Sequence, residues 1–298
     1  ELKPTTIHDI NAMVALYRPG PMETIPEYIR RKNDPSLVKY EDPRMENYLK
    51  ESHGLIVYQD DLLFSAIELA GYSWLEADKF RKAVGKKNRE EMAAQKEKLT
   101  EGIVKRGQTK AFAEKLWKLF EPFQAYGFNK AHAASYGNLA YKTAYMKANF
   151  PAIYMAAVLT GAHGDTEEIS IYINECKRLG IPVLAPNINE SFGDFTVIKG
   201  EKTGGGMDAQ GNFIPEVLHD KIRFGLYSIK NFGEGIGDVI IVERKNNGPF
   251  TTLENFLDRV KDKNLNKKSL EALVKAGAMD DFGNRSVMLA NLADLLEY

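Results

Sequence analysis

Apolar side chains recur every three or four positions through the first half of the chain, which is the spacing of an amphipathic helix. Thr6 or Asp9 is placed to cap an early helix. Pro19 predicts a helix end, and Pro151 predicts a kink or break before a helix over 152–160, because proline disfavours helical backbone in the residue before it. The pattern predicts further helices over 55–71, 76–84, 89–106 and 110–120, and one that begins at residue 131.

The pattern changes near residue 169. An amphipathic helix over 169–180 ends at a glycine, and three short apolar runs predict β-strands. The segment 199–221 is polar and rich in glycine, which predicts a mobile loop or a hairpin tip. The predicted strands are 181–184, 195–198 and 222–226.

These elements predict a mainly α fold in three parts. Residues 1–165 form a helical domain, 166–226 a small mixed α/β subdomain that includes the loop at 199–221, and 227–298 a helical C-terminal segment.

Composition describes an ordinary globular protein, with 44% hydrophobic and 27% charged residues. The one cysteine, Cys176, excludes a disulfide framework and is expected in the core, which fits a reducing, cytoplasmic setting. No apolar run reaches membrane-spanning length, and the first residues do not resemble a signal peptide. The chain does not begin with methionine, so we expect a fragment of a longer protein.

Positive charge is concentrated in one part of the chain, although the whole chain has a net charge of −1. Residues 79–147 contain sixteen Lys or Arg and only six acidic residues. Such a basic region is typical of a phosphate-binding surface. The alternative is a solvated helical face that is basic only in places.

The segment 125–136 places aromatic, cationic and small side chains at the start of the helix predicted from residue 131. Lys130 and His132 at this helix entrance favour an anion, because free backbone N–H groups and the helix dipole point there. The alternative is a tightly packed core helix with an aromatic edge.

Three segments, in this order, resemble motifs of the C-family replicative polymerases, the bacterial DNA polymerase III alpha subunits. They are LYRPGPM at 16–22, ADKFRKAVGKK at 77–87 and YGFNKAHAASYGNLAYKTAYMKANFP at 126–151. The resemblance covers the fingers domain and the start of the DNA-binding region that follows it. It implies a helical fingers domain that binds the incoming deoxynucleoside triphosphate (dNTP) and primer–template DNA.

Basic side chains near residue 85 are the leading candidates to bind a triphosphate. They do not form a P-loop, because Phe80 stands where the first glycine is needed and Lys87 where Ser or Thr is needed. The resemblance gives Arg81 and Lys82 the contact with the incoming nucleotide, although the family commonly has Arg at both positions. The predicted nucleotide-binding residues are Arg81, Lys82, Lys86, Lys87, Tyr126, Asn129, Lys130, His132 and Tyr136.

A second candidate site follows residue 229, where an apolar residue precedes Gly-x-Gly and an apolar helix. This order fits a helix-hairpin-helix, which presents backbone N–H groups to a DNA phosphate. Residues 264–268 precede another apolar helix and predict a second hairpin, the alternative being a simple turn between helices. Arg18 either contacts phosphate or braces its Pro-Gly-Pro turn. The predicted DNA-binding residues are Arg18, Lys230, Phe232, Gly233, Gly235, Gly237, Lys267 and Lys268.

Carboxylates for a two-metal site are missing, since the chain has no Asp-x-Asp pattern. We interpret the pairs Asp60-Asp61 and Asp280-Asp281 as surface features. The resemblance therefore implies that the catalytic aspartates and the Mg²⁺ that they bind lie in a palm domain outside this chain, so that no catalytic or metal-binding residue is assigned here.

The sequence thus predicts a fragment of a DNA-directed DNA polymerase for 5′–3′ replicative synthesis, inactive by itself. Its expected partners are primer–template DNA and dNTP, and, through regions outside the chain, other holoenzyme subunits including the sliding clamp; no membrane partner is expected. The alternatives are a stand-alone, non-enzymatic DNA-binding module and the fingers of an error-prone C-family polymerase.

Overall fold

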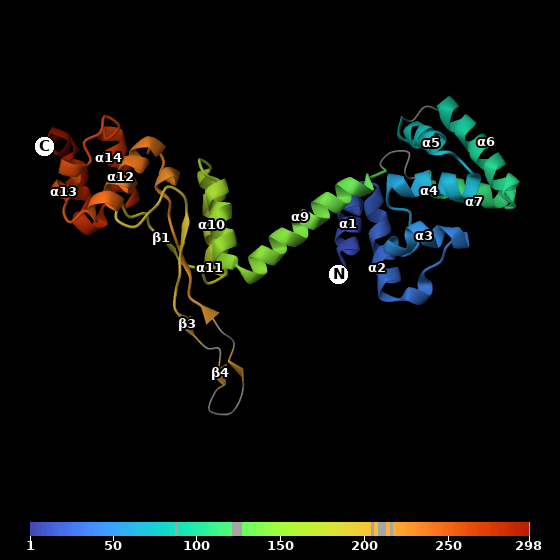
Figure 1. The fold of residues 1–298 in the computed structure, drawn as a ribbon, viewed down its shortest axis with the longest axis horizontal. Helices are drawn as coiled ribbons and strands as arrows, with labels where there is room; N and C mark the ends of the chain where they lie inside the picture. The colour runs from blue at the N-terminus through green and yellow to red at the C-terminus, as the bar shows by residue number, and fades with distance from the viewer. Residues whose placement is uncertain (87–88, 121–126, 204–205, 208–212, 215–216, 298) are drawn as a thin grey trace. The chain divides into compact units, whose positions relative to one another are not determined.

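The computed structural model describes residues 1–86, 89–120, 127–203, 206–207, 213–214 and 217–297, without the side chains of 85, 86, 89, 202, 213, 214, 217 and 218. Helices account for 66% of the structure, which confirms the predicted mainly α class. The chain divides into two compact units, Glu1–Thr143 and Ala144–Tyr298 (Figure 1). The predicted boundaries near residues 165 and 226 stay predictions.

Unit 1 is built from helices joined by short 3₁₀ turns. The α-helices are α1 (Ile7–Leu16), α2 (Ile25–Asn33), α3 (Glu46–Leu49), α4 (Gln59–Ala70), α5 (Trp74–Lys86), α6 (Arg89–Lys105), α7 (Lys110–Phe120) and α9 (Lys130–Asn149), which continues into unit 2. The 3₁₀ turns are η1 (Pro21–Thr24), η2 (Pro35–Leu37), η3 (Pro43–Met45) and η4 (Lys50–Ser52). Every helix expected in this half is present.

The larger core of unit 1 lies among α4, α5, α6 and α7. Phe80 of α5 is fully buried there, with its ring 5.9 Å from that of Phe120. Helix α4 starts four residues later than the apolar pattern suggested, because the carboxylate of Asp61 turns back to accept the N–H groups of Val57 and Tyr58, both at 2.8 Å. These bonds hold 57–58 extended and cap the helix.

Asp61 is therefore not the surface residue that the sequence suggested. Its side chain is 1% exposed, and burial raises its pKa to about 7. The pair Asp280-Asp281 is exposed, as expected: Asp280 forms an ion pair with Arg285.

A smaller core of unit 1 joins α1, α2 and the first part of α9. Asp9 of α1 is 2% exposed and accepts the hydroxyl of Tyr28 at 3.0 Å. Gly137 of α9 lies against α1 so closely that a Cβ there would be 1.9 Å from Oδ1 of Asn11. The absence of a side chain at this position thus allows α1 and α9 to approach each other closely.

Unit 2 begins with helices, continues through short strands and ends in helices. The helices are α10 (Pro151–Gly161), α11 (Thr166–Arg178), α12 (Glu234–Asn247), α13 (Leu253–Arg259), α14 (Lys267–Ala276), α15 (Arg285–Ala290) and α16 (Leu292–Glu297), with 3₁₀ turns η5 (Leu226–Ser228) and η6 (Asp280–Phe282). The strands are β1 (Val183–Leu184), β2 (Thr196–Ile198), β3 (Lys202–Thr203), β4 (Gly206–Met207), β5 (Phe213–Ile214), β6 (Val217–Leu218) and β7 (Lys221–Arg223). The break expected at Pro151 is confirmed, since α9 ends at Asn149.

A three-stranded sheet has the order β1-β7-β2, with β1 parallel and β2 antiparallel to β7. Ile222 of β7 pairs with Val183 and Val197 and is fully buried against α10 and α11. Cys176 of α11 lies in the same core with no exposed surface, and burial raises its pKa to about 11, so the predicted core role is confirmed. Between β2 and β7, β3 pairs with β6 and β4 with β5. The mobility expected for 199–221 concerns a segment that lies partly outside the described residues.

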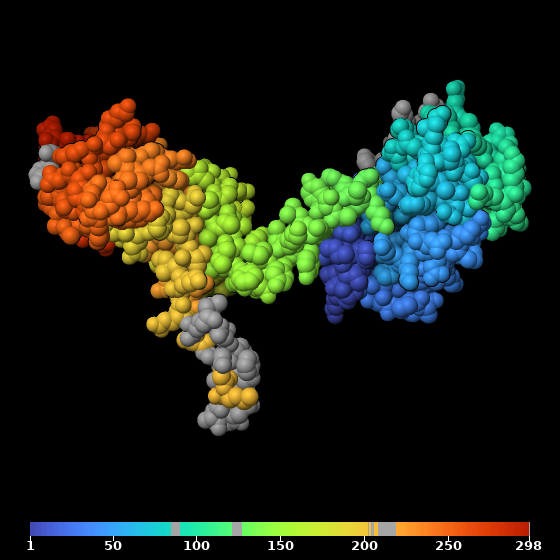
Figure 2. Space-filling view, in the orientation of Figure 1, coloured from blue at the N-terminus to red at the C-terminus, as the bar shows by residue number. Residues whose placement is uncertain are grey.

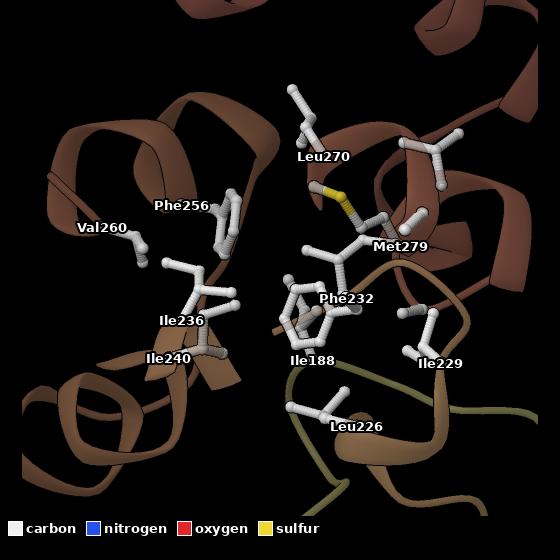
Figure 3. Packing of buried hydrophobic residues seen from close by; sticks show 14 of the residues in the cluster. Ile188, Leu226, Ile229, Phe232, Ile236, Ile240, Phe256, Val260, Leu270 and Met279 are labelled. Carbon is white, nitrogen blue, oxygen red and sulfur yellow. The ribbon is translucent and has the colours of Figure 1, made fainter. Parts of the chain in front are cut away.

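The C-terminal helices of unit 2, orange to red in Figure 2, share a second core. Figure 3 shows the Phe232 ring in the middle of this cluster, facing side chains of several helices. Ile236 and Ile240 of α12 contribute one side of it, and Leu270 of α14 and Met279 contribute another. This core fixes the loop before α12 next to α14.

Candidate nucleic-acid interface

The predicted basic pair lies on α5 in unit 1. Arg81 donates through Nη2 to Oδ1 of Asp78 at 2.8 Å, and Nζ of Lys82 lies 2.7 Å from the other carboxylate oxygen. Both cations hold the pKa of Asp78 below its usual range, the Lys82 hydrogen bond most of all. Side chains of Arg81 and Lys82 remain 30% and 56% exposed, so both can reach a ligand.

Gln59 connects Arg81 to the entrance of α9. The Arg81 guanidinium donates to Oε1 of Gln59 at 3.2 Å, and the Gln59 backbone N–H donates to the carbonyl of Phe128 at 2.9 Å. Gly127 packs directly against the Gln59 side chain, because any Cβ at this position would lie only 2.5 Å from Cγ of Gln59. Residues far apart in sequence are thereby brought together within unit 1.

Aromatic rings continue from Phe128 along α9. The ring of His132 lies 5.4 Å from that of Phe128 and 4.7 Å from that of Tyr136. The guanidinium of Arg18 lies over Phe128, 4.7 Å from the ring centroid, and also donates to the carbonyl of Ala15 at 3.0 Å. His132 and Tyr136 are exposed, so this row of rings offers a surface on which a planar ligand can stack.

The entrance of α9 is already occupied by groups of the chain itself. Asp60 accepts the backbone N–H of Lys130 at 2.9 Å, and Oδ1 of Asn129 accepts that of His132 at 2.8 Å. The Lys130 ammonium forms an ion pair with Glu51, also at 2.9 Å. The expectation of free N–H groups that attract an anion at this entrance is therefore wrong: carboxylate and amide oxygens cap the helix instead.

The entrance of α12 in unit 2 is different. Asn231 has a positive φ of 66°, and Gly233 precedes the helix without any side chain capping it. Glu234 and Gly235 begin the helix, so their N–H groups have no carbonyl partner within it. A Cβ on Gly233 or Gly235 would meet no atom within 4 Å. The protein's own packing therefore does not require glycine at these two positions.

The second predicted hairpin lies beside this entrance. Asn266, which precedes α14, and Lys268 in its first turn line the same surface pocket of about 240 Å³ as Asn231, Gly233 and Gly235. Helix α14 is capped by its own chain, because Oδ1 of Asn266 accepts the N–H of Lys268 at 3.0 Å. The ammonium of Lys268 contacts no acidic side chain among the described residues. Lys230 and Lys267 are exposed as well.

Two of the predicted DNA-binding residues lie inside the protein. Phe232 is 7% exposed and belongs to the core around α12. Gly237 is buried, and a Cβ there would lie 3.0 Å from the ring of Tyr227. Both residues therefore shape the hairpin from within. The Lys86 side chain and all of Lys87 and Tyr126 lie outside the described residues.

Comparisons with known proteins address the whole chain. Residues 1–107 match the sequence model of the bacterial DNA polymerase III alpha subunit finger domain, and residues 180–288 match a helix-hairpin-helix motif. A DNA polymerase III subunit alpha from Thermus aquaticus is 44% identical over 100% of this chain and 23% of its own length. Those of Borreliella burgdorferi and Treponema pallidum are 41% and 39% identical, over 100% and 99% of this chain and 24% of each relative. The chain belongs to the family of bacterial DNA polymerase III alpha subunits.

The chain spans about a quarter of the length of the alpha subunits that it matches. Among the described residues, no three His, Cys, Asp or Glu side chains come together to hold a metal ion. In the same residues, no helix is both long enough and apolar enough to span a membrane.

Sequence reasoning missed the residues that hold the side chains and helix ends of the two candidate sites in place. Asp78 precedes Arg81 and Lys82 by three and four positions, a helical spacing that could have revealed the ion pairs. Asn266 stands three positions before Ser269, which is a capping pattern. No local pattern indicates that Asp60 caps a helix that begins 70 residues later.

Proposed function

We propose that this chain is the part of a DNA-directed DNA polymerase that binds primer–template DNA and the incoming dNTP. The observation that carries the proposal is the surface at α12, where both predicted hairpins line one pocket. Family membership supports it, since the relatives are named DNA polymerase III subunit alpha.

The DNA contact is proposed for the uncapped start of α12. A phosphate group carries the negative charge that the N-terminal N–H groups and the dipole of a helix attract. Gly233 and Gly235 leave open space there, so the backbone can approach a phosphate without a side chain in between. Lys230 and Lys268 add positive charge beside it. Contacts of this kind hold any DNA sequence equally well.

The dNTP contact is proposed for the surface of unit 1 around Arg81. Arg81 and Lys82 share one carboxylate, Asp78, and a triphosphate would compete with it for both cations. His132 and Tyr136 provide rings for stacking. Gln59 connects Arg81 to Phe128, whose ring lies beside that of His132. Lys130 is a weaker candidate, because Glu51 already neutralises it.

Phosphoryl transfer itself is proposed to occur outside this chain. When bound in the parent polymerase, Mg²⁺ would neutralise charge on the transferring phosphates. The residues of this chain would bind and orient the substrates, and the chain alone would be inactive. Assembly with other subunits of a cytoplasmic replicative polymerase, including the sliding clamp, would use regions of the parent protein outside this chain.

Fluorescence anisotropy of labelled primer–template DNA over a salt series tests the DNA contact. The Gly233→Val/Gly235→Val variant should bind about tenfold more weakly or worse, because a hydrogen bond to a charged group contributes roughly 1.5–3 kcal/mol. Gly161→Val is the matched control, since Gly161 is also exposed and a Cβ there also meets nothing within 4 Å.

Wild-type affinity should fall steeply with salt, as expected when phosphates are neutralised. Absence of wild-type binding at low salt would contradict the proposal. Equal losses of DNA affinity in the double variant and in Gly161→Val would show that the α12 entrance does not contact the DNA.

The nucleotide contact needs a separate measurement, titration of the chain with a fluorescent dNTP and Mg²⁺. Arg81→Ala should weaken binding more than Lys82→Ala, because only a guanidinium contacts phosphate with two parallel hydrogen bonds. Arg178→Ala is the control, since that exposed arginine of unit 2 also pairs with one carboxylate, Glu175. Equal affinity in Arg81→Ala and Arg178→Ala would contradict this assignment.

A further inference from the structure

A second surface depression adjoins the pocket at the α12 entrance and follows one face of α14. Lys268, Glu271, Ala272 and Lys275 of α14 line it, facing Lys230 and Asn231. These α14 positions are three, four and seven residues apart, so they share one face of the helix. Lys268 and Asn231 also line the pocket at Gly233 and Gly235, so the two depressions adjoin. We call this second depression the α14 groove; its volume is about 310 Å³.

The α14 groove carries more positive than negative charge. Lys230 and Lys268 pair with no acidic side chain in the described part of the chain. Lys275 forms an ion pair with Glu271 at 2.5 Å, and this lysine keeps the pKa of Glu271 below its usual range. Three ammonium groups therefore face one carboxylate that stays ionised. The lining also has an apolar part, to which the largely buried Ala272 belongs.

The length of the groove suits a DNA strand. Lys268 and Lys275 are separated by seven residues, or about 10 Å along the helix axis. One strand of duplex DNA advances about 3.4 Å per nucleotide, so this distance corresponds to about three nucleotides. The N-terminus of α14 cannot itself bind phosphate, because Asn266 caps it. Binding here must therefore use side chains.

We propose that the α14 groove is a second phosphate-binding site, in which Lys275 holds a phosphate about three nucleotides along the same strand that contacts the α12 entrance beside Lys268. This inference rests on the proposed DNA-binding function. Glu271 lowers the affinity of the site, because its carboxylate faces the phosphate and competes for Lys275. The groove thus fixes the direction in which the strand leaves the α12 entrance.

The test compares Lys275→Gln and Glu271→Gln in the 298-residue chain by anisotropy with primer–template DNA over a salt series. Lys275→Gln should weaken binding several-fold and reduce the slope of log affinity against log salt by about 0.9, the value for one lost phosphate contact. Glu271→Gln should strengthen binding. Lys177→Gln and Glu168→Gln on α11 carry the same charge changes at exposed positions away from the groove and should change neither quantity as much.

A scan with oligonucleotides that carry one uncharged methylphosphonate at a time locates the site. Neutralising one phosphate should weaken wild-type binding but leave Lys275→Gln unaffected. A second phosphate is identified as the one whose neutralisation no longer changes binding in the Gly233→Val/Gly235→Val variant. The two phosphates should lie on the same strand, within about three nucleotides of each other. Thermal unfolding of each variant checks that the fold is retained, which is expected because both side chains are exposed.

The outcomes separate the two proposals. If Lys275→Gln behaves as Lys177→Gln while the double glycine variant loses affinity, the α14 groove is not a phosphate site and the α12 contact stands. A sensitive phosphate on the opposite strand would also overturn the inference. If the wild-type chain does not bind DNA at low salt, both proposals fail.

Discussion

Two helix entrances, those of α9 and α12, looked alike as candidate phosphate sites and differ in the structure. At α9, Asp60 and Asn129 accept the first free N–H groups, and Glu51 neutralises Lys130. At α12, no side chain caps the helix. A nearby lysine is therefore insufficient evidence for an anion site, because the N–H groups must also be free.

The glycines of the two helices differ in the same way. Gly137 of α9 makes room for α1 and is needed for packing. Gly233 and Gly235 at α12 face open space. Gly233 and Gly235 neither adopt positive φ nor pack against a neighbour, so the fold itself does not require glycine at these positions.

The largest expected effect concerns Asp61, the buried neighbour of the Asp60 that closes the α9 entrance. In the unfolded chain Asp61 loses its proton near pH 4, whereas burial raises the folded pKa to about 7. The folded chain therefore binds more protons between these values, and this contribution to stability is full below pH 4 and falls as pH rises towards 7. In wild type, this loss of unfolding free energy between pH 4 and pH 7 is at most about 4 kcal/mol. Asp61→Asn should remove the loss, while its amide oxygen can still accept both backbone N–H groups.

Urea unfolding at pH 4 and pH 7.5 measures this, with Asp281→Asn on the exposed pair as control. The stability of Asp61→Asn relative to wild type should be greater at the higher pH. A difference that does not change with pH would show that Asp61 is not held in a buried, protonation-sensitive position.

The second prediction contrasts glycine to alanine changes in the two helices. Gly137→Ala should destabilise unit 1 by about 1–3 kcal/mol, because its Cβ collides with Asn11. Gly235→Ala should stabilise unit 2 by up to about 1 kcal/mol, since alanine favours helix and has space. The same Gly235→Ala should weaken DNA binding. Urea unfolding and anisotropy check both; a destabilised Gly235→Ala would contradict the open space at α12.

The smallest effect comes from removing caps. Asp60→Ala should lower the stability of unit 1 by about 1 kcal/mol, because the Lys130 N–H loses its acceptor. Asn266→Ala on α14 should cost about as much in unit 2 for the same reason. DNA affinity should not change in Asp60→Ala. Thermal unfolding gives the stabilities, and an unchanged melting temperature for Asp60→Ala would mean that the α9 entrance is not closed as described.

Helices and their ends were largely predictable from the sequence. The periodic apolar residues of α5 to α7 and the proline at 151 act locally, so the chain pattern alone locates those elements. The two hairpins could be recognised for the same reason, since the glycines and the following helices lie within a few residues of each other. The start of α4 was misplaced because an acidic side chain, and not the apolar pattern, ends the extended segment before it.

The sequence by itself therefore determined the mainly α fold, the family and the basic character of the candidate surface. Only the tertiary structure decided which helix entrance is open. Asp60 reaches Lys130 across 70 residues, and the core around Phe232 holds Gly233 beside Lys268. Such contacts depend on how distant elements pack, whereas capping and periodicity depend on neighbours within one or two turns.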